Sequence, residues 1–286
     1  MRRLRFLAGS LNRRHLSGGI HCFVLICALS CVSKSVPTER FTASLSMVPP
    51  LLKPAVADPG HFSFAVVGDT HIEWQNTERL RTILTMASNQ GAAFVVLLGD
   101  IVDYGEEADY LAVLKAVRDT GWYGRVAYVL GNHDIIQDGW NHFRTYLGPS
   151  HFSFSAGNSR VVALDTADGT VDRDEQTWFA GELAAAASTN LFVLSHYLPF
   201  VPGQRTYLKI ASDEEAQGLM KVASDRGVHT WFGAHYHSYA VGTVEGVDYV
   251  VAGGGGKRRM PPVMDYFFVR VDVAGKDVKY NLVTVP

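Results

Sequence analysis

The sequence predicts an α/β fold, with β-sheets at the centre and helices outside, and two observations lead to this prediction. Between residues 62 and 232, short apolar segments rich in Val, Leu and Phe alternate with segments that have the spacing of amphipathic helices. Beyond residue 237, alternating apolar and polar residues indicate further strands that follow one another without a helix. Alternation of strands and helices, followed by strands alone, is typical of layered α/β domains.

Three groups of segments make up this prediction. Six apolar segments are expected to be buried strands, at residues 62–67, 93–98, 125–130, 160–164, 191–194 and 228–232. Four segments with polar faces are expected to be helices, at residues 77–89, 106–118, 175–187 and 213–225. An antiparallel meander is expected at residues 239–244, 248–251, 266–273 and 278–285.

The first thirty residues have the pattern of an export signal. Five arginines and no acidic residue precede an apolar run at residues 20–32, which is shorter than the roughly 20 residues that a membrane-spanning helix needs. Ala28 and Ser30 place small side chains where a signal peptidase cleaves. We therefore predict an exported protein, periplasmic or secreted. An uncleaved N-terminus, or one lipidated at Cys31, would instead anchor the protein to a membrane.

Residues 31–60 are expected to be a linker, because residues 36–59 are rich in Pro, Ser and Ala and show little periodicity. Residues 61–286 are then one large domain. All three cysteines precede it, so the domain has neither disulfides nor a cysteine metal site. Without the five arginines of the signal, 21 basic residues face 28 acidic ones, a net charge of −7. Such an acidic domain is a poor candidate for an extended nucleic-acid surface.

Five of the predicted strands end in Asp, Asn or His. These residues are Asp69 and His71, Asp100 and Asp103, Asn132 with His133 and Asp134, His196, and His235 with His237. Taken singly, each is more typical of a turn or a loop. In open α/β sheets, however, ligands bind at the carboxyl ends of the strands, and five such ends together indicate one shared site.

The chemistry of these residues favours metal ions. Carboxylates, an amide oxygen and imidazoles without thiolates suit Mn, Fe or Zn better than Ca²⁺, which prefers oxygen ligands alone. Seven of these side chains are candidate ligands, more than one ion needs, and they suit two divalent or trivalent ions that share a carboxylate. They are Asp69, His71, Asp100, Asn132, His196, His235 and His237. Two ions about 3.5–4 Å apart can activate a bridging water and bind the attacking and leaving oxygens of a phosphoryl transfer.

The order of these motifs carries a resemblance to a known family. Asp-x-His, Gly-Asp-x-x-Asp, Gly-Asn-His-Asp, a distant His and Gly-x-His-x-His, between residues 62 and 256, resemble the calcineurin-like metallophosphoesterases. The resemblance implies a sandwich of two mixed β-sheets flanked by helices, with residues 61–286 as the catalytic domain. It also implies hydrolysis of phosphomonoesters or phosphodiesters, with a metal-bridging hydroxide as the nucleophile.

The resemblance further implies a role for each residue. One metal would be held by Asp69, His71 and His237, the other by Asn132, His196 and His235, and Asp100 would bridge the two. His133 would contact the phosphate and protonate the leaving oxygen, with Asp134 orienting its ring. Asp103 would not bind a metal itself but would interact with one of the metal ligands.

Departures from the family pattern narrow the choice of activity. Protein serine/threonine phosphatases have Arg and Glu where this chain has Tyr104 and Asp134, so that branch is disfavoured. A small phosphate ester is the expected substrate. A metal-dependent nuclease, or a cyclic-nucleotide phosphodiesterase, is the alternative. A non-catalytic metal-binding relic is disfavoured, because such proteins typically lack a ligand or the acid and none is missing here.

A further substrate contact is predicted beyond the metal ligands and His133. Four glycines at residues 253–256 would let the backbone approach a ligand closely. The basic residues Lys257, Arg258 and Arg259 follow, and guanidinium groups bind phosphate oxygens in pairs. We therefore predict that Arg258 and Arg259 bind the anionic part of the substrate, with a solvated surface loop as the alternative.

Overall fold

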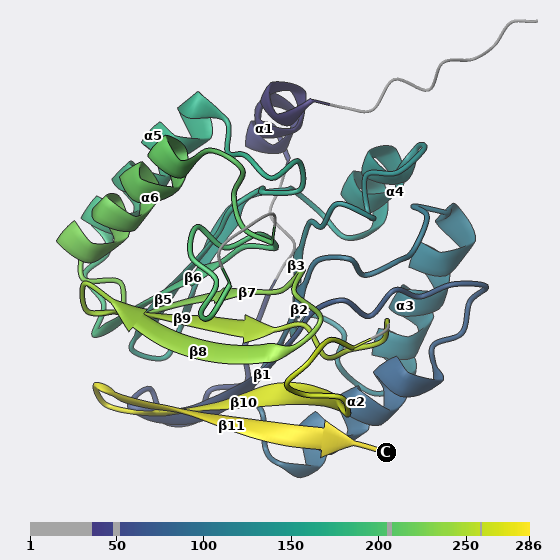
Figure 1. Cartoon of the computed structure of the whole chain (residues 1–286). Helices are drawn as coiled ribbons and strands as arrows, with labels where there is room; N and C mark the ends of the chain where they lie inside the picture. Colours follow the sequence, from purple (N-terminus) through teal and green to yellow (C-terminus); the bar gives the residue numbers. More distant parts are fainter. Residues whose placement is uncertain (1–35, 48–51, 205–207, 258) are drawn as a thin grey trace, which may run out of the picture. The chain divides into compact units, whose positions relative to one another are not determined.

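The computed structural model describes residues 36–47, 52–204, 208–257 and 259–286, all within the compact unit Val32–Pro286 (Figure 1). The predicted export signal at residues 1–30 lies outside the described residues, as does Arg258. Within the described part of the chain, no helix is long and apolar enough to cross a membrane.

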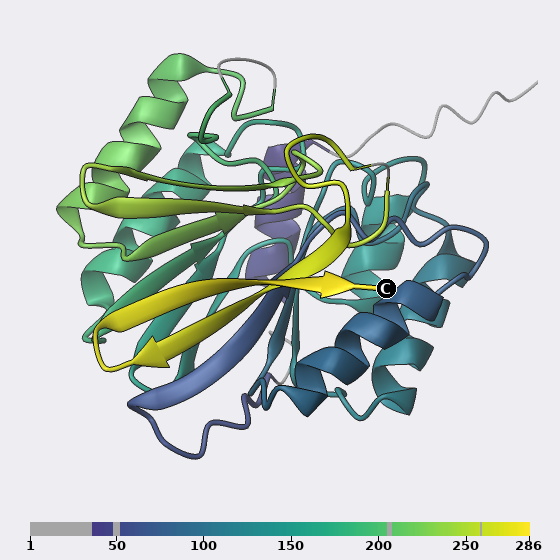
Figure 2. The same cartoon turned by 60° about the horizontal axis from the view of Figure 1, so that its bottom comes forward.

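Two mixed β-sheets form the centre of the domain (Figures 1 and 2). The first sheet has the order β11-β10-β1-β2-β3, and its strands are β1 (His61–Val67), β2 (Val95–Leu98), β3 (Val126–Val129), β10 (Tyr266–Ala274) and β11 (Asp277–Val285). The second has the order β4-β5-β6-β7-β9-β8, and its strands are β4 (Phe152–Ala156), β5 (Ser159–Ala163), β6 (Asn190–Leu194), β7 (Thr230–Gly233), β8 (Tyr239–Val244) and β9 (Val247–Ala252).

Helices cover the outer face of each sheet. The first sheet packs against α2 (Glu78–Asn89), α3 (Glu107–Asp119) and α4 (Gly139–Tyr146). The second packs against α5 (Arg173–Ala185) and α6 (Asp213–Asp225), which lie at the upper left of Figure 1. The predicted architecture, two mixed sheets flanked by helices, is therefore confirmed.

The apolar strands bury side chains on both faces. In β1, Phe64 and Val66 point between the two sheets, whereas Ala65 and Val67 point toward the helices. Because side chains alternate along a strand, a strand covered on both sides must be apolar at every position. This requirement explains the continuous apolar runs that precede each polar strand end.

The predicted meander is wrong. The last four strands form two hairpins in different sheets, because β9 pairs in parallel with β7 and β10 pairs antiparallel with β1. Period-two alternation indicates that a segment is a strand but not which strand it pairs with. The pattern also missed the edge strand β4 and the short helix α4.

The segment expected to be a linker contains a packed helix, α1 (Pro37–Leu45), so the linker is not structureless. Arg40 of this helix is fully buried and pairs with Asp165 at 2.7 Å and with Asp168 at 2.7 Å. Phe41 is buried beside it and stacks on the ring of His151. The helix escaped prediction because an arginine, rather than an apolar stripe, is at the centre of its buried face.

Candidate metal centre

The loops that follow β1, β2, β3, β6 and β7 bring all seven predicted metal ligands together. Three groups of side chains have potential ligand atoms within 4.8 Å of one another. The first is Asp69, His71, Asp100 and His237, the second is Asp100, His196 and His235, and the third is His71, Asp103 and His133. Asp100 belongs to the first two groups. The seventh predicted ligand, Asn132, lies beside the second group, with its Oδ1 3.1 Å from Nε2 of His196.

Strained backbone positions these side chains. Asp69, His71, Asp100 and His235 all have positive φ angles, at 58°, 42°, 49° and 64°. Residues with a Cβ rarely adopt this left-handed conformation, and each instance costs on the order of 1–3 kcal/mol. Such strain persists only where the surrounding structure enforces it, and here it turns four polar side chains toward one centre.

Hydrogen bonds fix the tautomers of the histidines. Nδ1 of His71 lies 2.8 Å from Oδ1 of Asp103, and Nδ1 of His196 lies 2.8 Å from the carbonyl oxygen of Leu98. These oxygens accept, so each Nδ1 donates. In the neutral rings, Nε2 then keeps its lone pair and faces the centre. Metal-binding histidines in proteins are typically held in this way.

Several buried polar atoms at the centre have no hydrogen-bond partner. They are Oδ2 of Asp69, Nε2 of His71 and Nδ1 of His235. A buried polar atom without a partner costs roughly 1–3 kcal/mol, and a buried charge costs more. A cation bound by these atoms would remove that cost. The oxygen and nitrogen donors therefore fit a metal centre, and no cysteine is among them.

The charges at the centre compensate one another. Burial by itself would raise the pKa of Asp100, but the neighbouring His196 and His71 lower it below its ordinary value. Burial would lower the pKa of His196, yet Asp100 and Asp69 raise it to about 9. A proton on His196 thus balances carboxylate charge at the centre. A bound metal would displace that proton, because imidazole binds metal only in its neutral form.

The predicted role of Asp134 is wrong. Its carboxylate does not contact the ring of His133 but accepts backbone N–H hydrogen bonds from Ile101 (3.0 Å), Val102 (3.1 Å) and Gly131 (2.9 Å). Fully buried, it ties the loop after β2 to the loop after β3. Adjacency in sequence suggested a contact with His133, but consecutive side chains in a turn point in different directions.

Asp103 supports two histidines. Its carboxylate accepts from His71, and its carbonyl oxygen lies 2.7 Å from Nδ1 of His133, which therefore donates. Both carboxylate oxygens also contact Nζ of Lys257, at 2.7 and 2.6 Å. Burial would raise the pKa of Asp103, but hydrogen bonds from His71 and Lys257 lower it to about 2. Asp103 thus stays ionised behind His71.

The glycine run packs closely against the loop after β1. A Cβ at Gly253 would collide with Oδ2 of Asp69, and a Cβ at Gly256 would collide with the carbonyl oxygen of Thr70. The glycines are therefore required by the loop after β1, and their close approach to a ligand stays a prediction. The guanidinium of Arg259 lies 3.6 Å from the centre of the Tyr266 ring, and its Nε donates to the Met264 carbonyl oxygen at 2.7 Å. Its contact with substrate stays a prediction.

Sequence reasoning missed one residue at the centre. The ring of Tyr197 stacks on His235, with 3.9 Å between ring centres, and lies edge-on to His196. Its backbone N–H donates to Oγ1 of Thr166 at 2.8 Å. Tyr197 thus limits the rotation of His235. Its position directly after His196 was the only signal in the sequence.

Comparison with known proteins agrees with this geometry. Residues 62–239 match the calcineurin-like phosphoesterase family. A probable cyclic nucleotide phosphodiesterase of Fibrobacter succinogenes is 24% identical over 187 residues, which cover 63% of this chain and 72% of that protein.

Solved structures share the fold. The purple acid phosphatase PPD1 of yellow lupin superposes with a TM-score of 0.64 at 13% identity, over 82% of this chain and 52% of the lupin chain, so this chain spans about half of its length. A dimetal phosphatase of Danio rerio superposes with a TM-score of 0.56 at 16% identity, over 82% of this chain and all of that chain. The predicted resemblance is confirmed: this chain belongs to the calcineurin-like phosphoesterase family and is a hydrolase of phosphate esters.

Proposed function

We propose that the protein hydrolyses small phosphomonoesters or phosphodiesters with two metal ions. The observation that carries this proposal is that two groups of ligand atoms share the single carboxylate of Asp100. A carboxylate has two oxygens and can contact two ions at once. Its full burial, at 1% exposure, also argues for a compensating charge on each side.

The two groups divide the remaining ligands. Asp69, His71 and His237 would hold the first ion, and Asn132, His196 and His235 the second. When bound, the ions supply Lewis acidity and a nucleophilic water at neutral pH. Mn, Fe and Zn suit this mixture of nitrogen and oxygen ligands.

His133 is placed to serve the leaving group. Its Nδ1 donates to the Asp103 carbonyl oxygen, and its backbone N–H donates to Oδ1 of Asp100 at 2.8 Å. The ring is 30% exposed, in contrast to the buried metal ligands beside it. With Nδ1 engaged, a protonated His133 presents its second proton at Nε2. It can transfer that proton to the leaving oxygen as the phosphate ester bond breaks.

A cyclic nucleotide is the second candidate substrate. The Fibrobacter succinogenes relative is described as a probable cyclic nucleotide phosphodiesterase, and this chain covers 72% of its length. A cyclic phosphodiester has its leaving oxygen on the same molecule as its phosphate, so the proposed role of His133 applies to it unchanged. A nuclease is less well supported, because the predicted mature domain is acidic.

Metal binding and activity test the proposal together. Protein stripped with a chelator should bind two Mn²⁺ or Zn²⁺ per chain in calorimetry, and the loaded protein should hydrolyse members of a monoester and diester panel. Asp100→Asn should abolish turnover and lower the metal stoichiometry, because a neutral amide cannot balance two cations. Asp119→Asn, at an exposed ion pair with Arg81, is the matched control. Two bound metals and normal turnover in Asp100→Asn would refute the shared site.

We also propose that the protein is exported, on the pattern of residues 1–30. The mature N-terminus should then lie near Cys31. Mass spectrometry of the native protein checks this, because Met1 retained in a cytosolic fraction would contradict export. An intact or lipidated N-terminus in the membrane fraction would favour anchorage.

A further inference from the structure

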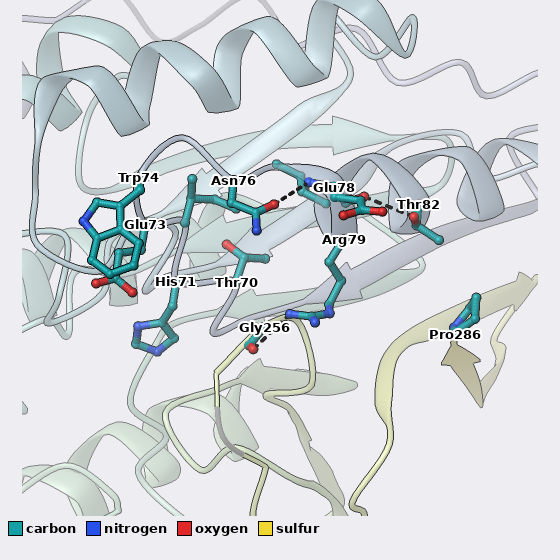
Figure 3. A pocket seen from close by; sticks show the side chains of 12 residues that line it. Thr70, His71, Glu73, Trp74, Asn76, Glu78, Arg79, Thr82, Gly256 and Pro286 are labelled. Carbon is teal, nitrogen blue, oxygen red and sulfur yellow. Dashed lines mark hydrogen bonds between the residues drawn. The ribbon is translucent and has the colours of Figure 1, made fainter.

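A polar pocket adjoins the metal centre. It has a volume of about 690 Å³, within the range of small-molecule sites, and His71 and Gly256 contribute to its lining. Figure 3 shows Trp74 and Glu73 at one end, near His71, and Arg79 farther along the pocket. The pocket therefore begins beside a predicted metal ligand and extends away from it.

Trp74 is unusually exposed and strained. It is 83% exposed, although tryptophan is generally a well-buried residue. Trp74 and Gln75 both have left-handed backbones, with φ angles of 51° and 61°, and the N–H of Asn76 donates to the carbonyl oxygen of Glu73 at 3.1 Å. Such turns usually have Gly, Asn or Asp at both central positions. A bulky aromatic residue there is an outlier that folding alone does not favour.

The strained turn is held from a separate element. The N–H of Gln75 donates to Oδ1 of Asp109 at 2.6 Å, and Asp109, in α3, is only 2% exposed. A buried carboxylate thus fixes the turn that presents the indole to solvent. Strain that the surrounding structure maintains is typical of functional positions.

The position of Trp74 relates it to the metal centre. It is three residues from His71, so their Cα atoms lie at most about 11 Å apart. A nucleoside monophosphate spans a comparable length between its phosphate and its base. Glu73 and Asn76, on either side, supply polar groups that could pair with the edge of a base.

We propose that Trp74 is a stacking platform for the nucleobase of a nucleotide substrate whose phosphate is bound at the metal centre. This inference rests on the proposed phosphoesterase function and narrows its substrate class to nucleotides. A flat indole face binds a base by stacking, and loss of one such contact typically weakens binding by about tenfold or more. The other polar lining residues orient the nucleoside.

Binding of two matched probes tests the platform. Adenosine 5′-monophosphate carries a base and ribose 5-phosphate does not, while their phosphates are alike. Trp74→Ala should weaken binding of adenosine monophosphate about tenfold and leave ribose 5-phosphate within twofold, and Trp74→Phe should retain most of the affinity. Tyr123→Ala, 74% exposed in a different pocket, is the control and should change neither affinity.

A third variant distinguishes a role of Trp74 in the stability of the fold from a role in ligand binding. Trp74→Gly removes the left-handed strain, so it should melt at the same or a higher temperature while losing affinity for adenosine monophosphate. A tryptophan that served only the fold would lower the melting temperature when replaced.

Binding is measured by calorimetry on metal-loaded protein that carries His133→Ala in every variant, so that turnover is suppressed and the two probes stay intact. Equal affinity of wild type and Trp74→Ala for adenosine monophosphate would overturn the platform, even in an active phosphoesterase. An equal loss for both probes would also overturn it, because that would place Trp74 against the phosphate or the sugar. If no phosphate ester were hydrolysed, the proposed function would fail, while base-dependent binding through Trp74 would still support the platform.

Discussion

The carbonyl oxygen of Asp103 accepts a hydrogen bond from Nδ1 of His133 at 2.7 Å, while the carboxylate of the same residue accepts one from His71 at 2.8 Å. One residue thus orients two rings with different predicted roles, a general acid and a metal ligand. Because the two contacts use different groups of Asp103, side-chain substitution can remove the second without removing the first.

His133→Ala should keep its metal ions and lose roughly 10²–10⁴ in kcat, the usual contribution of a general acid. The loss should be smaller for substrates with acidic leaving groups, such as nitrophenol, since these need little protonation. Steady-state kinetics over a series of leaving groups measures this. His142→Ala is the matched control, because Nδ1 of His142 also lies 2.8 Å from a carbonyl oxygen, that of Gly105. Equal losses across the series would exclude the acid role.

Asp103→Asn should weaken metal binding by about 10–100-fold, the usual effect of losing a carboxylate behind a metal-bound histidine. The alkaline limb of the pH–rate profile, where a general acid loses its proton, should move much less than the metal affinity, because His133 keeps the carbonyl that holds its Nδ1 and loses only the carboxylate charge 3.4 Å away. Metal titration followed by kinetics at saturating metal separates the two effects. Lys257→Met removes the other contact of the same carboxylate and should leave metal affinity unchanged or higher. A normal metal affinity in Asp103→Asn would contradict the support of His71.

Asp134→Asn should destabilise the protein by about 1–3 kcal/mol, because one end of the amide would turn an N–H toward a backbone N–H donor. The carboxylate of Asp134 accepts from three such donors, on two loops of the metal centre. Denaturant unfolding measures the loss. If Asp134 oriented His133 instead, stability would hold and the leaving-group dependence of the rate would change.

The residues of the site could be predicted from the sequence more accurately than the pairing of the strands could. Polar residues at the carboxyl ends of parallel strands lie along one edge of the sheet. The shared site of Asp69, Asp100 and His196 could therefore be predicted without knowing which strands pair. Pairing itself depends on contacts distant in sequence. β9 and β10 therefore appeared to be consecutive strands of one sheet, whereas they belong to two.

The role of each residue in the site was harder to predict than which residues belong to the site. The backbone contacts of Asp134 and the ion pair of Lys257 with Asp103 both depend on the exact course of loops, which residue type does not determine. Arg40 illustrates the same limit in the fold. An arginine is normally exposed, and Asp165 and Asp168, more than 120 residues away, supply the carboxylates that help to make its burial possible.

Arg40→Met should destabilise the domain by about 3–5 kcal/mol, because it leaves the buried Asp165 without its cation. The effect should be large although α1 lies in the segment expected to be a linker. Arg81→Met is the control, since its ion pair with Asp119 is about one-third exposed and should contribute no more than about 1 kcal/mol. Urea unfolding of both variants gives the comparison. Similar small losses would show that α1 is not part of the stable domain.

His151 should make stability depend on pH in the acid range. Its ring packs on Phe41 and Trp178, with 4.6 and 4.7 Å between ring centres, and its Nδ1 is buried without a partner. Burial lowers the pKa of His151 to about 4 from an ordinary 6.5, although the charges of Asp165 and Glu182 oppose the shift.

Between pH 6.5 and 4, the unfolded chain therefore binds a proton at His151 that the folded protein does not. The stabilisation is complete above pH 6.5 and is lost as the pH falls toward 4, by about 1–3 kcal/mol. His151→Phe keeps the stacked ring and removes the proton. The difference in unfolding free energy between wild type and His151→Phe, measured in urea at several pH values, should therefore change with pH in this window and be constant above it. Parallel curves from pH 7 to 4 would show that His151 titrates alike in both states, because other acidic groups affect the two proteins equally.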